Sequence, residues 1–120
     1  MAEKPQRKYD LEDRTLKFAK SIRKFVKNLP NSTSNFEDVK QLVRSSGSVG
    51  ANYIEANEAL SKKDFILRIK ISRKESKESR YWLNLIDTKE DKILNKERGE
   101  YIQEAQELMN IFGAILKKSE

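Results

Sequence analysis

Four long segments of this chain place apolar residues at alternating spacings of three and four, which is the period of one face of an α-helix. The first segment is the clearest, with Leu11, Phe18, Ile22 and Phe25 in one register. The 120 residues include only two prolines and four glycines, and no segment shows the apolar-polar alternation of a half-buried strand. The pattern therefore predicts an all-α fold.

The boundaries of these segments predict short connections between the helices. Ser34 with Glu37 and Ser61 with Asp64 fit capping boxes, in which two orphan backbone N–H groups are satisfied reciprocally. Helices of this length joined by short loops form an antiparallel, up-down-up-down four-helix bundle. We expect a flexible basic tail over residues 1–9 and a bundle domain over residues 10–120, with helices at about 11–29, 35–60, 62–88 and 96–118.

The composition excludes several classes of chemistry. The chain has no cysteine and no histidine, so disulfides, thiolate or imidazole metal sites, and Ser-His-Asp triads are impossible. No apolar run approaches the roughly 18 residues of a membrane span, and the N-terminal segment lacks an apolar signal core. We therefore expect a cytoplasmic protein that is not an enzyme, binds no cofactor or metal and does not enter a membrane.

The stretch RSSGSVGANYIEA, residues 44–56, places small residues in the middle of the second helical stripe, which runs from Phe36 to Leu60. Each glycine inside a helix costs about 1 kcal/mol relative to alanine, so packing must offset the loss. If the chain folds back at Leu60, residues whose numbers sum to about 123 lie opposite each other. The small side chains then meet and the two backbones approach closely, or else the helix is kinked or interrupted. The residues expected in this contact are Ser46, Gly47, Gly50, Ala51, Ser72 and Ser76.

A polar stripe that includes Asn52 and Glu55 runs beside this contact. The same fold-back places Glu55 opposite Arg68, and we predict an ion pair between them. The alternative is that both charges are exposed and meet only by chance in this register.

Basic residues are concentrated in two segments. Residues 1–30 carry nine Lys or Arg against four acids, and residues 61–80 carry eight against three, within a net charge of +6. We expect ridges on two neighbouring helices that bind nucleic acid through phosphates, with little sequence selectivity. A solvated helix surface is the alternative. The candidate residues are Lys17, Lys20, Lys24 and Lys27, together with Lys70, Arg73, Lys74, Lys77 and Arg80.

The third helical segment is apolar on more than one side. Ile66, Ile71 and Trp82 lie off its main stripe, and a helix with a second apolar side needs a second partner. Core packing of Trp82 is the competing interpretation. We predict that these three residues contribute to an interface between copies of the chain.

The sequences QLVRSSGSVGANYIEA and SKKDFILRIKISRKESKE resemble a family of small bacterial four-helix proteins encoded in intervening sequences of large-subunit ribosomal RNA genes. A related branch comprises the accessory variability proteins of diversity-generating retroelements. The matching positions include Gln41, Leu42, Ala51, Asn52 and Glu55, whereas Val43 stands where the family usually has a second arginine. The resemblance covers nearly the whole chain.

The resemblance implies a left-handed antiparallel bundle that assembles as a homopentamer without known enzymatic activity. In the retroelement branch it also implies binding of a reverse transcriptase and of nucleic acid. Our leading hypothesis is a non-enzymatic, basic, homo-oligomeric scaffold or accessory protein that binds RNA or DNA. The alternative is a structural or protein-interaction ring with no nucleic-acid role.

Overall fold

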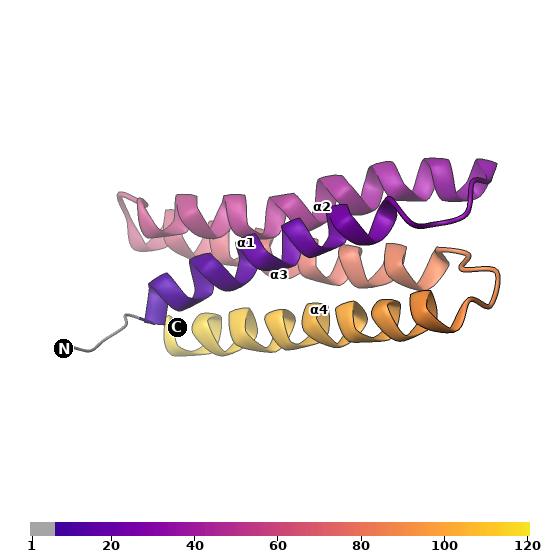
Figure 1. The fold of residues 1–120 in the computed structure, drawn as a ribbon. Helices are drawn as coiled ribbons and strands as arrows, with labels where there is room; N and C mark the ends of the chain where they lie inside the picture. The colour runs from indigo at the N-terminus through magenta and orange to yellow at the C-terminus, as the bar shows by residue number, and fades with distance from the viewer. Residues whose placement is uncertain (1–6) are drawn as a thin grey trace.

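The computed structural model describes the chain from residue 7 to residue 120, and its side chains from residue 11. Four helices follow one another along the chain: α1 (Arg7–Val26), α2 (Thr33–Asn57), α3 (Lys62–Leu85) and α4 (Lys92–Lys118). Successive helices run in opposite directions (Figure 1), and the described residues contain no strand. The prediction of an all-α, antiparallel four-helix bundle is confirmed.

The first helix starts and ends earlier than expected. It begins at Arg7, so residues 7–9, which we expected in a flexible tail, are helical. The expected tail otherwise lies outside the described residues. The helix ends at Val26, and Leu29 belongs to the connection that leads into α2.

Capping residues explain where α2 and α4 begin, whereas α2 and α3 each end three residues before the expected bounds, at Asn57 and Leu85. Ser32, rather than Ser34, is the N-cap of α2, and its hydroxyl accepts a hydrogen bond from the Asn35 N–H at 3.1 Å. The carboxylate of Asp91 accepts from the Leu94 N–H at 2.9 Å, so α4 begins at Lys92 and not at residue 96. The predicted cap at Ser61 is confirmed, since its hydroxyl accepts from the Asp64 N–H at 3.0 Å.

The core lies along the stripes predicted for α1, α3 and α4. Ile22, Ile69 and Phe112, one from each helix, are fully buried. The stripe predicted for α2 is rotated by one residue at its ends, because Phe36 and Leu60 are 64% and 100% exposed. The side chains that α2 buries are Asn35, Leu42, Ser45, Ser46, Val49, Tyr53 and Ala56.

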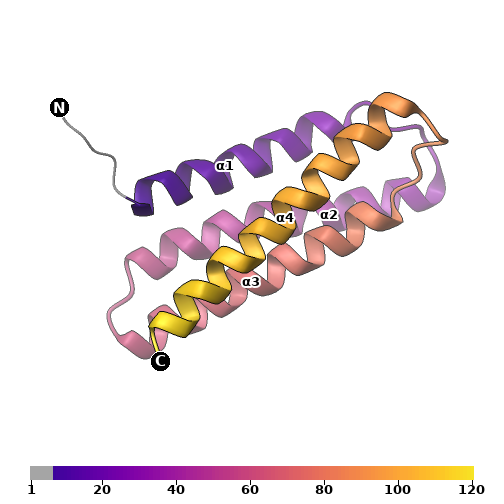
Figure 2. The same ribbon diagram turned by 90° about the horizontal axis from the view of Figure 1, so that it is seen from below.

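Each helix contacts the two helices beside it. α1 packs against α2 and α4, and α3 packs against the same two helices, whereas α1 and α3 do not contact each other within the described residues. The largest contact joins α2 to α3. In Figure 2 α4 passes between α1 and α3, which lie on opposite sides of the bundle.

One buried amide ties two connections together at the same end of the bundle. The Asn35 Nδ2 donates to the carbonyl oxygens of Pro30 at 3.0 Å and Asp87 at 2.8 Å, and its Oδ1 accepts from the Asp87 N–H at 2.9 Å. Asn35 is 2% exposed. Its amide therefore joins the α1–α2 connection to the α3–α4 connection and satisfies backbone groups that water does not reach.

Candidate nucleic-acid and subunit surfaces

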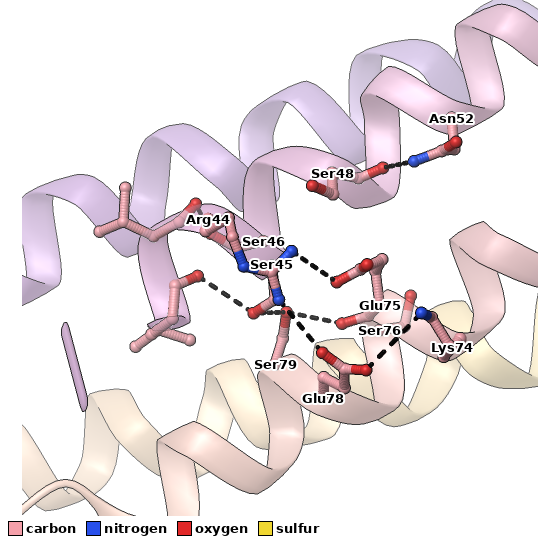
Figure 3. A network of polar contacts seen from close by, with 12 residues as sticks. Arg44, Ser45, Ser46, Ser48, Asn52, Lys74, Glu75, Ser76, Glu78 and Ser79 are labelled. Atoms are coloured by element: carbon pink, nitrogen blue, oxygen red, sulfur yellow. Dashed lines mark hydrogen bonds and ion pairs between the residues drawn. The ribbon is translucent and has the colours of Figure 1, made fainter. Parts of the chain in front are cut away.

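The contact between α2 and α3 is made by small polar side chains (Figure 3). The buried Ser72 hydroxyl donates to the backbone carbonyl of Val49 at 2.9 Å, so α3 reaches the main chain of α2 directly. The Ser79 hydroxyl lies 3.0 Å from that of Ser45, and both are fully buried. The predicted close approach is confirmed, and α2 continues as an unbroken helix, which contradicts the alternative of an interruption.

The glycines of this stretch face a different neighbour from the one predicted. A Cβ added at Gly50 would lie 2.8 Å from Thr15 Oγ1, and one at Gly47 would lie 3.2 Å from a guanidinium nitrogen of Arg23. At both glycines the atoms nearest to an added Cβ therefore belong to α1. Ser46 is fully buried, and its hydroxyl donates to the Val43 carbonyl of its own helix at 3.2 Å; its contact with α3 stays a prediction.

The predicted ion pair between Glu55 and Arg68 is wrong. Glu55 is exposed, and a guanidinium nitrogen of Arg68 donates instead to Asn52 Oδ1 at 3.0 Å. The Asn52 amide nitrogen donates in turn to the Ser48 carbonyl at 2.9 Å. Asn52 lies on the flank of α2 that faces α3, whereas Glu55 and the exposed Ala51 lie further out on the helix surface.

A buried carboxylate lies beside the serine contact, and the sequence did not single it out. Glu75 of α3 is 6% exposed, and its Oε1 has no hydrogen-bond donor. The nearest cation is Arg44 of α2, whose guanidinium lies 3.5 Å from Glu75 and 3.2 Å from Glu78 (Figure 3). The 3.5 Å separation is long for a charge-assisted hydrogen bond, so Arg44 stabilises Glu75 mainly through its charge.

Exposed lysines form a row along α1 and the turn that follows it. We name this row the α1 ridge; it consists of Lys17, Lys20, Lys24 and Lys27. All four lysines are exposed, and none forms an ion pair with another described residue. The chain carries no acid from Arg14 to Phe36. The α1 ridge is therefore a strip of positive charge about 15 Å long, at 1.5 Å per residue. Asp13 and Glu100 line hollows beside it.

The basic residues of α3 are divided between solvent and protein partners. Lys70, Arg73 and Lys77, which we name the α3 ridge, are exposed. Lys74 forms an ion pair with Glu78 at 4.0 Å, and a guanidinium nitrogen of Arg80 donates to Gln106 of α4. The expectation that the two ridges lie on neighbouring helices is wrong, because α1 and α3 are diagonal in the bundle.

Large apolar side chains remain exposed on two separate sides. Leu67 and Leu85 of α3 are 53% and 47% exposed, and Leu16 of α1 and Ile54 of α2 are 53% and 50% exposed. Ile54 lies one turn from both Gly50 and Asn57, which contact α1, so it shares the α1–α2 side with Leu16. The α3 side and the α1–α2 side are the candidate subunit surfaces.

The three predicted interface residues are all half-buried. Trp82 packs against the core on one side and meets the exposed ring of Tyr81 edge-on, with ring centroids 5.1 Å apart. The Trp82 indole N–H is buried and has no acceptor. Ile66 lines an open hollow of about 650 Å³ at the start of α3, together with Lys63 and Lys70. Trp82 therefore packs partly in the core, and its place in an interface between copies stays a prediction.

A charged cluster joins α1 to α4. The Arg14 guanidinium donates to both carboxylate oxygens of Glu104, at 2.7 and 2.8 Å, and to Glu107 at 2.7 Å. The hydrogen bond to Glu104 raises the pKa of Arg14 above its ordinary value. The hydrogen bond from Gln103, followed by that from Arg14, lowers the pKa of Glu107. When they are charged, Arg14, Glu104 and Glu107 hold α1 against α4.

The described residues offer no group of three or more acids that could hold a metal ion. Within the same part of the chain, none of the helices has the length and apolar character needed to cross a bilayer.

Burial raises the pKa values of the Tyr53 and Tyr101 hydroxyls, which lie at the edge of the core.

The fold and its surfaces define an antiparallel four-helix bundle with a serine-lined α2–α3 contact and a basic exterior. A family model described as "23S rRNA-intervening sequence protein" matches residues 7–114, so the chain belongs to that family. Among solved structures, a protein with unknown function from the S23 ribosomal protein family of Bacteroides thetaiotaomicron is similar, with 33% identity and a TM-score of 0.76. The match covers 88% of this chain and 97% of that one. No curated protein matches the sequence.

Proposed function

We propose that this member of the 23S rRNA-intervening sequence protein family is a non-enzymatic cytoplasmic scaffold that binds RNA or DNA through phosphate contacts. The observation that carries the proposal is the α1 ridge with its four exposed lysines. These lysines lie in the segment from Arg14 to Phe36, which contains no acidic residue. Lysines on a helix surface bind phosphates as point charges and read no bases. The expected binding is therefore strong in low salt and insensitive to sequence.

The proposed binding is tested by titrating a fluorescent RNA duplex with the protein at several salt concentrations. Each lysine-phosphate contact contributes about 0.9 to the slope of log affinity against log salt. Replacing the four lysines of the α1 ridge by glutamine should lower that slope by about 3 to 4. The matched control replaces Lys89, Lys92, Lys96 and Lys118, which are equally exposed but lie elsewhere, and should change the slope less. Absence of binding at low salt contradicts the proposal.

We further propose that the protein works as a homo-oligomeric ring, with the pentamer that the family resemblance implies. The supporting observation is that Leu67 and Leu85 are exposed on α3, and that Leu16 and Ile54 are exposed on α1 and α2. The other large exposed aliphatic or phenyl side chains, Phe36, Leu60 and Ile93, lie at or near helix ends. Two unlike surfaces that bind each other join copies head to tail, and such contacts close into rings. The apolar sides are also our candidates for docking a protein partner such as a reverse transcriptase.

The ring is tested by measuring the mass in solution by light scattering. Wild-type protein should give five copies, and Leu67→Glu should reduce the mass because it places a charge in the proposed α3 surface. Leu60→Glu is the control, since Leu60 is fully exposed at the α2–α3 turn and lies outside that surface. A ring that assembles without binding RNA would favour the alternative, a structural or protein-interaction ring. A monomeric wild type contradicts the ring.

A further inference from the structure

The two basic ridges lie on helices that do not touch. The α1 ridge follows α1 from Lys17 to Lys24 and continues to Lys27 in the turn after the helix, and the α3 ridge follows α3 from Lys70 to Lys77. α1 and α3 each contact α2 and α4 but not each other within the described residues. Figure 2 shows α4 passing between them. The two ridges therefore face different sides of one molecule.

Carboxylates lie between the ridges on the α4 side. Arg73 of the α3 ridge lies beside α4, since its guanidinium group is 3.9–4.0 Å from the position of a Cβ at Gly113. On its other side α4 presents Glu104 and Glu107 to Arg14 of α1, and Glu100 lines the same hollow as Lys17. A polyanion lying across α4 would therefore leave one ridge and meet acids before it reached the other.

The route around α2 also passes acids. Glu75 and Glu78 of α3 already engage Arg44 of α2, and Glu55 of α2 is exposed. The side chain of Arg44 is half exposed, but its positive charge is offset by these two carboxylates, so Arg44 is not a free basic step between the ridges. Neither route offers a continuous basic surface, so one nucleic-acid segment cannot follow both ridges along an unbroken positive path.

We propose that a single copy of this protein holds two nucleic-acid segments at once, one along the α1 ridge and one along the α3 ridge, and so bridges them. This inference rests on the proposed nucleic-acid binding and adds an activity to it. Phosphate contacts carry no sequence information, so the two segments need no common sequence and can belong to separate molecules. The bundle measures 45 × 34 × 19 Å, and its body keeps the two phosphate backbones apart.

The experiment is a capture assay with two RNA duplexes of unrelated sequence. One duplex is fixed to beads, the other is fluorescent, and the protein is added at low salt. Wild-type protein should retain the fluorescent duplex on the beads, and added salt should release it. Binding of each duplex alone is measured in parallel by fluorescence anisotropy.

Two ridge variants separate bridging from binding. The first carries Lys17→Gln, Lys20→Gln, Lys24→Gln and Lys27→Gln, and the second carries Lys70→Gln, Arg73→Gln and Lys77→Gln. Each variant should still bind one duplex through its remaining ridge, with a smaller salt dependence, but should lose at least about tenfold in capture. The control with Lys89, Lys92, Lys96 and Lys118 replaced by glutamine should retain capture. All the substituted positions are exposed, so each variant should keep the fold. Circular dichroism of each variant checks that its helix content is unchanged.

The outcomes distinguish this inference from the proposed function. No binding of a single duplex would overturn both. Binding without capture by wild-type protein would overturn bridging alone. Capture that survives loss of either ridge would show that separate copies in an oligomer join the duplexes, and would overturn bridging by a single copy. Capture that requires both ridges would support it.

Discussion

Gly50 of α2 lies directly against Thr15 of α1, so that a Cβ at residue 50 would be 2.8 Å from Thr15 Oγ1 and 3.1 Å from Thr15 Cβ. Thr15 is 1% exposed and its hydroxyl donates to the Glu12 carbonyl, so the side chain has little room to move. The absence of a side chain at Gly50 therefore sets the distance between the two helices.

We predict that Gly50→Ala destabilises the protein by about 1–3 kcal/mol, although alanine is the better helix former. The measurement is urea unfolding followed by circular dichroism. Gly99→Ala is the matched control, because Gly99 is an exposed helical glycine with no atom within 4 Å of its added Cβ. That control should raise stability by up to about 1 kcal/mol. Equal effects at both positions would contradict the close approach at Thr15.

The Asn35 bridge predicts a large effect of a small substitution. Asn35→Ala removes three buried hydrogen bonds to two connections and should cost about 2–4 kcal/mol of unfolding free energy. Asn31→Ala, at an exposed position of the same connection, is the control and should leave stability within about 0.5 kcal/mol of wild type. Thermal unfolding measures both. A melting temperature of Asn35→Ala equal to that of wild type would exclude the bridge as a structural tie.

The hydrogen bond from Ser72 to the Val49 carbonyl predicts a size limit at the α2–α3 contact. Ser72→Ala keeps the short distance between the helices and should cost about 1 kcal/mol, the usual value of one lost hydrogen bond. Ser72→Leu must separate the backbones and should cost at least about 3 kcal/mol. Chemical unfolding of the two variants is the comparison, and a leucine variant as stable as the alanine variant would be inconsistent with direct contact.

The cluster of Arg14, Glu104 and Glu107 predicts a loss of stability in acid. The folded pKa of Glu107 lies below its ordinary value of 4.5, so its contribution is present above that value and is lost as the pH falls through the folded pKa. Glu107→Gln should therefore flatten the decline in melting temperature below pH 4.5. Arg14→Gln should flatten it less, since Gln103 is the larger cause of the shift. Unchanged profiles for both variants would argue against the cluster.

Helical periodicity was sufficient to predict the number and order of the helices and the buried faces of α1, α3 and α4. It was less informative for α2, where serine and glycine provide little apolar contrast between adjacent faces. The fold-back about Leu60 placed the correct stretches of α2 and α3 together, as the contacts Ser45–Ser79 and Val49–Ser72 show. It could not predict that Gly50 faces α1, because a residue without a side chain gives no sign of the direction it faces.

The polar pairs were predicted less well, for a geometric reason. Folding the chain back at the turn predicts which residues of α2 and α3 lie at the same level along the helix axes. It does not predict the direction in which each side chain points around its helix. Glu55 and Asn52 are separated by less than one turn, and only Asn52 points toward Arg68. The buried Glu75 was missed because its neighbours in sequence, Lys74 and Lys77, indicate a solvated surface. The expectation that the two ridges lie on neighbouring helices was wrong, although the up-down-up-down order places consecutive helices side by side and leaves α1 and α3 diagonal.

The hydroxyl groups between α2 and α3 have a consequence for how uniquely this hairpin can fold. Leucine-rich helix pairs tolerate sliding by one turn, because successive turns of an apolar helix face present similar side chains. Here the same displacement would separate the Ser72 hydroxyl from the Val49 carbonyl in a dry interior, with an energetic penalty for the orphaned hydroxyl, and would break the contact between the Ser79 and Ser45 hydroxyls. Replacing the serines by alanine would leave the bundle compact, yet would remove the feature that distinguishes the native alignment from its shifted competitors.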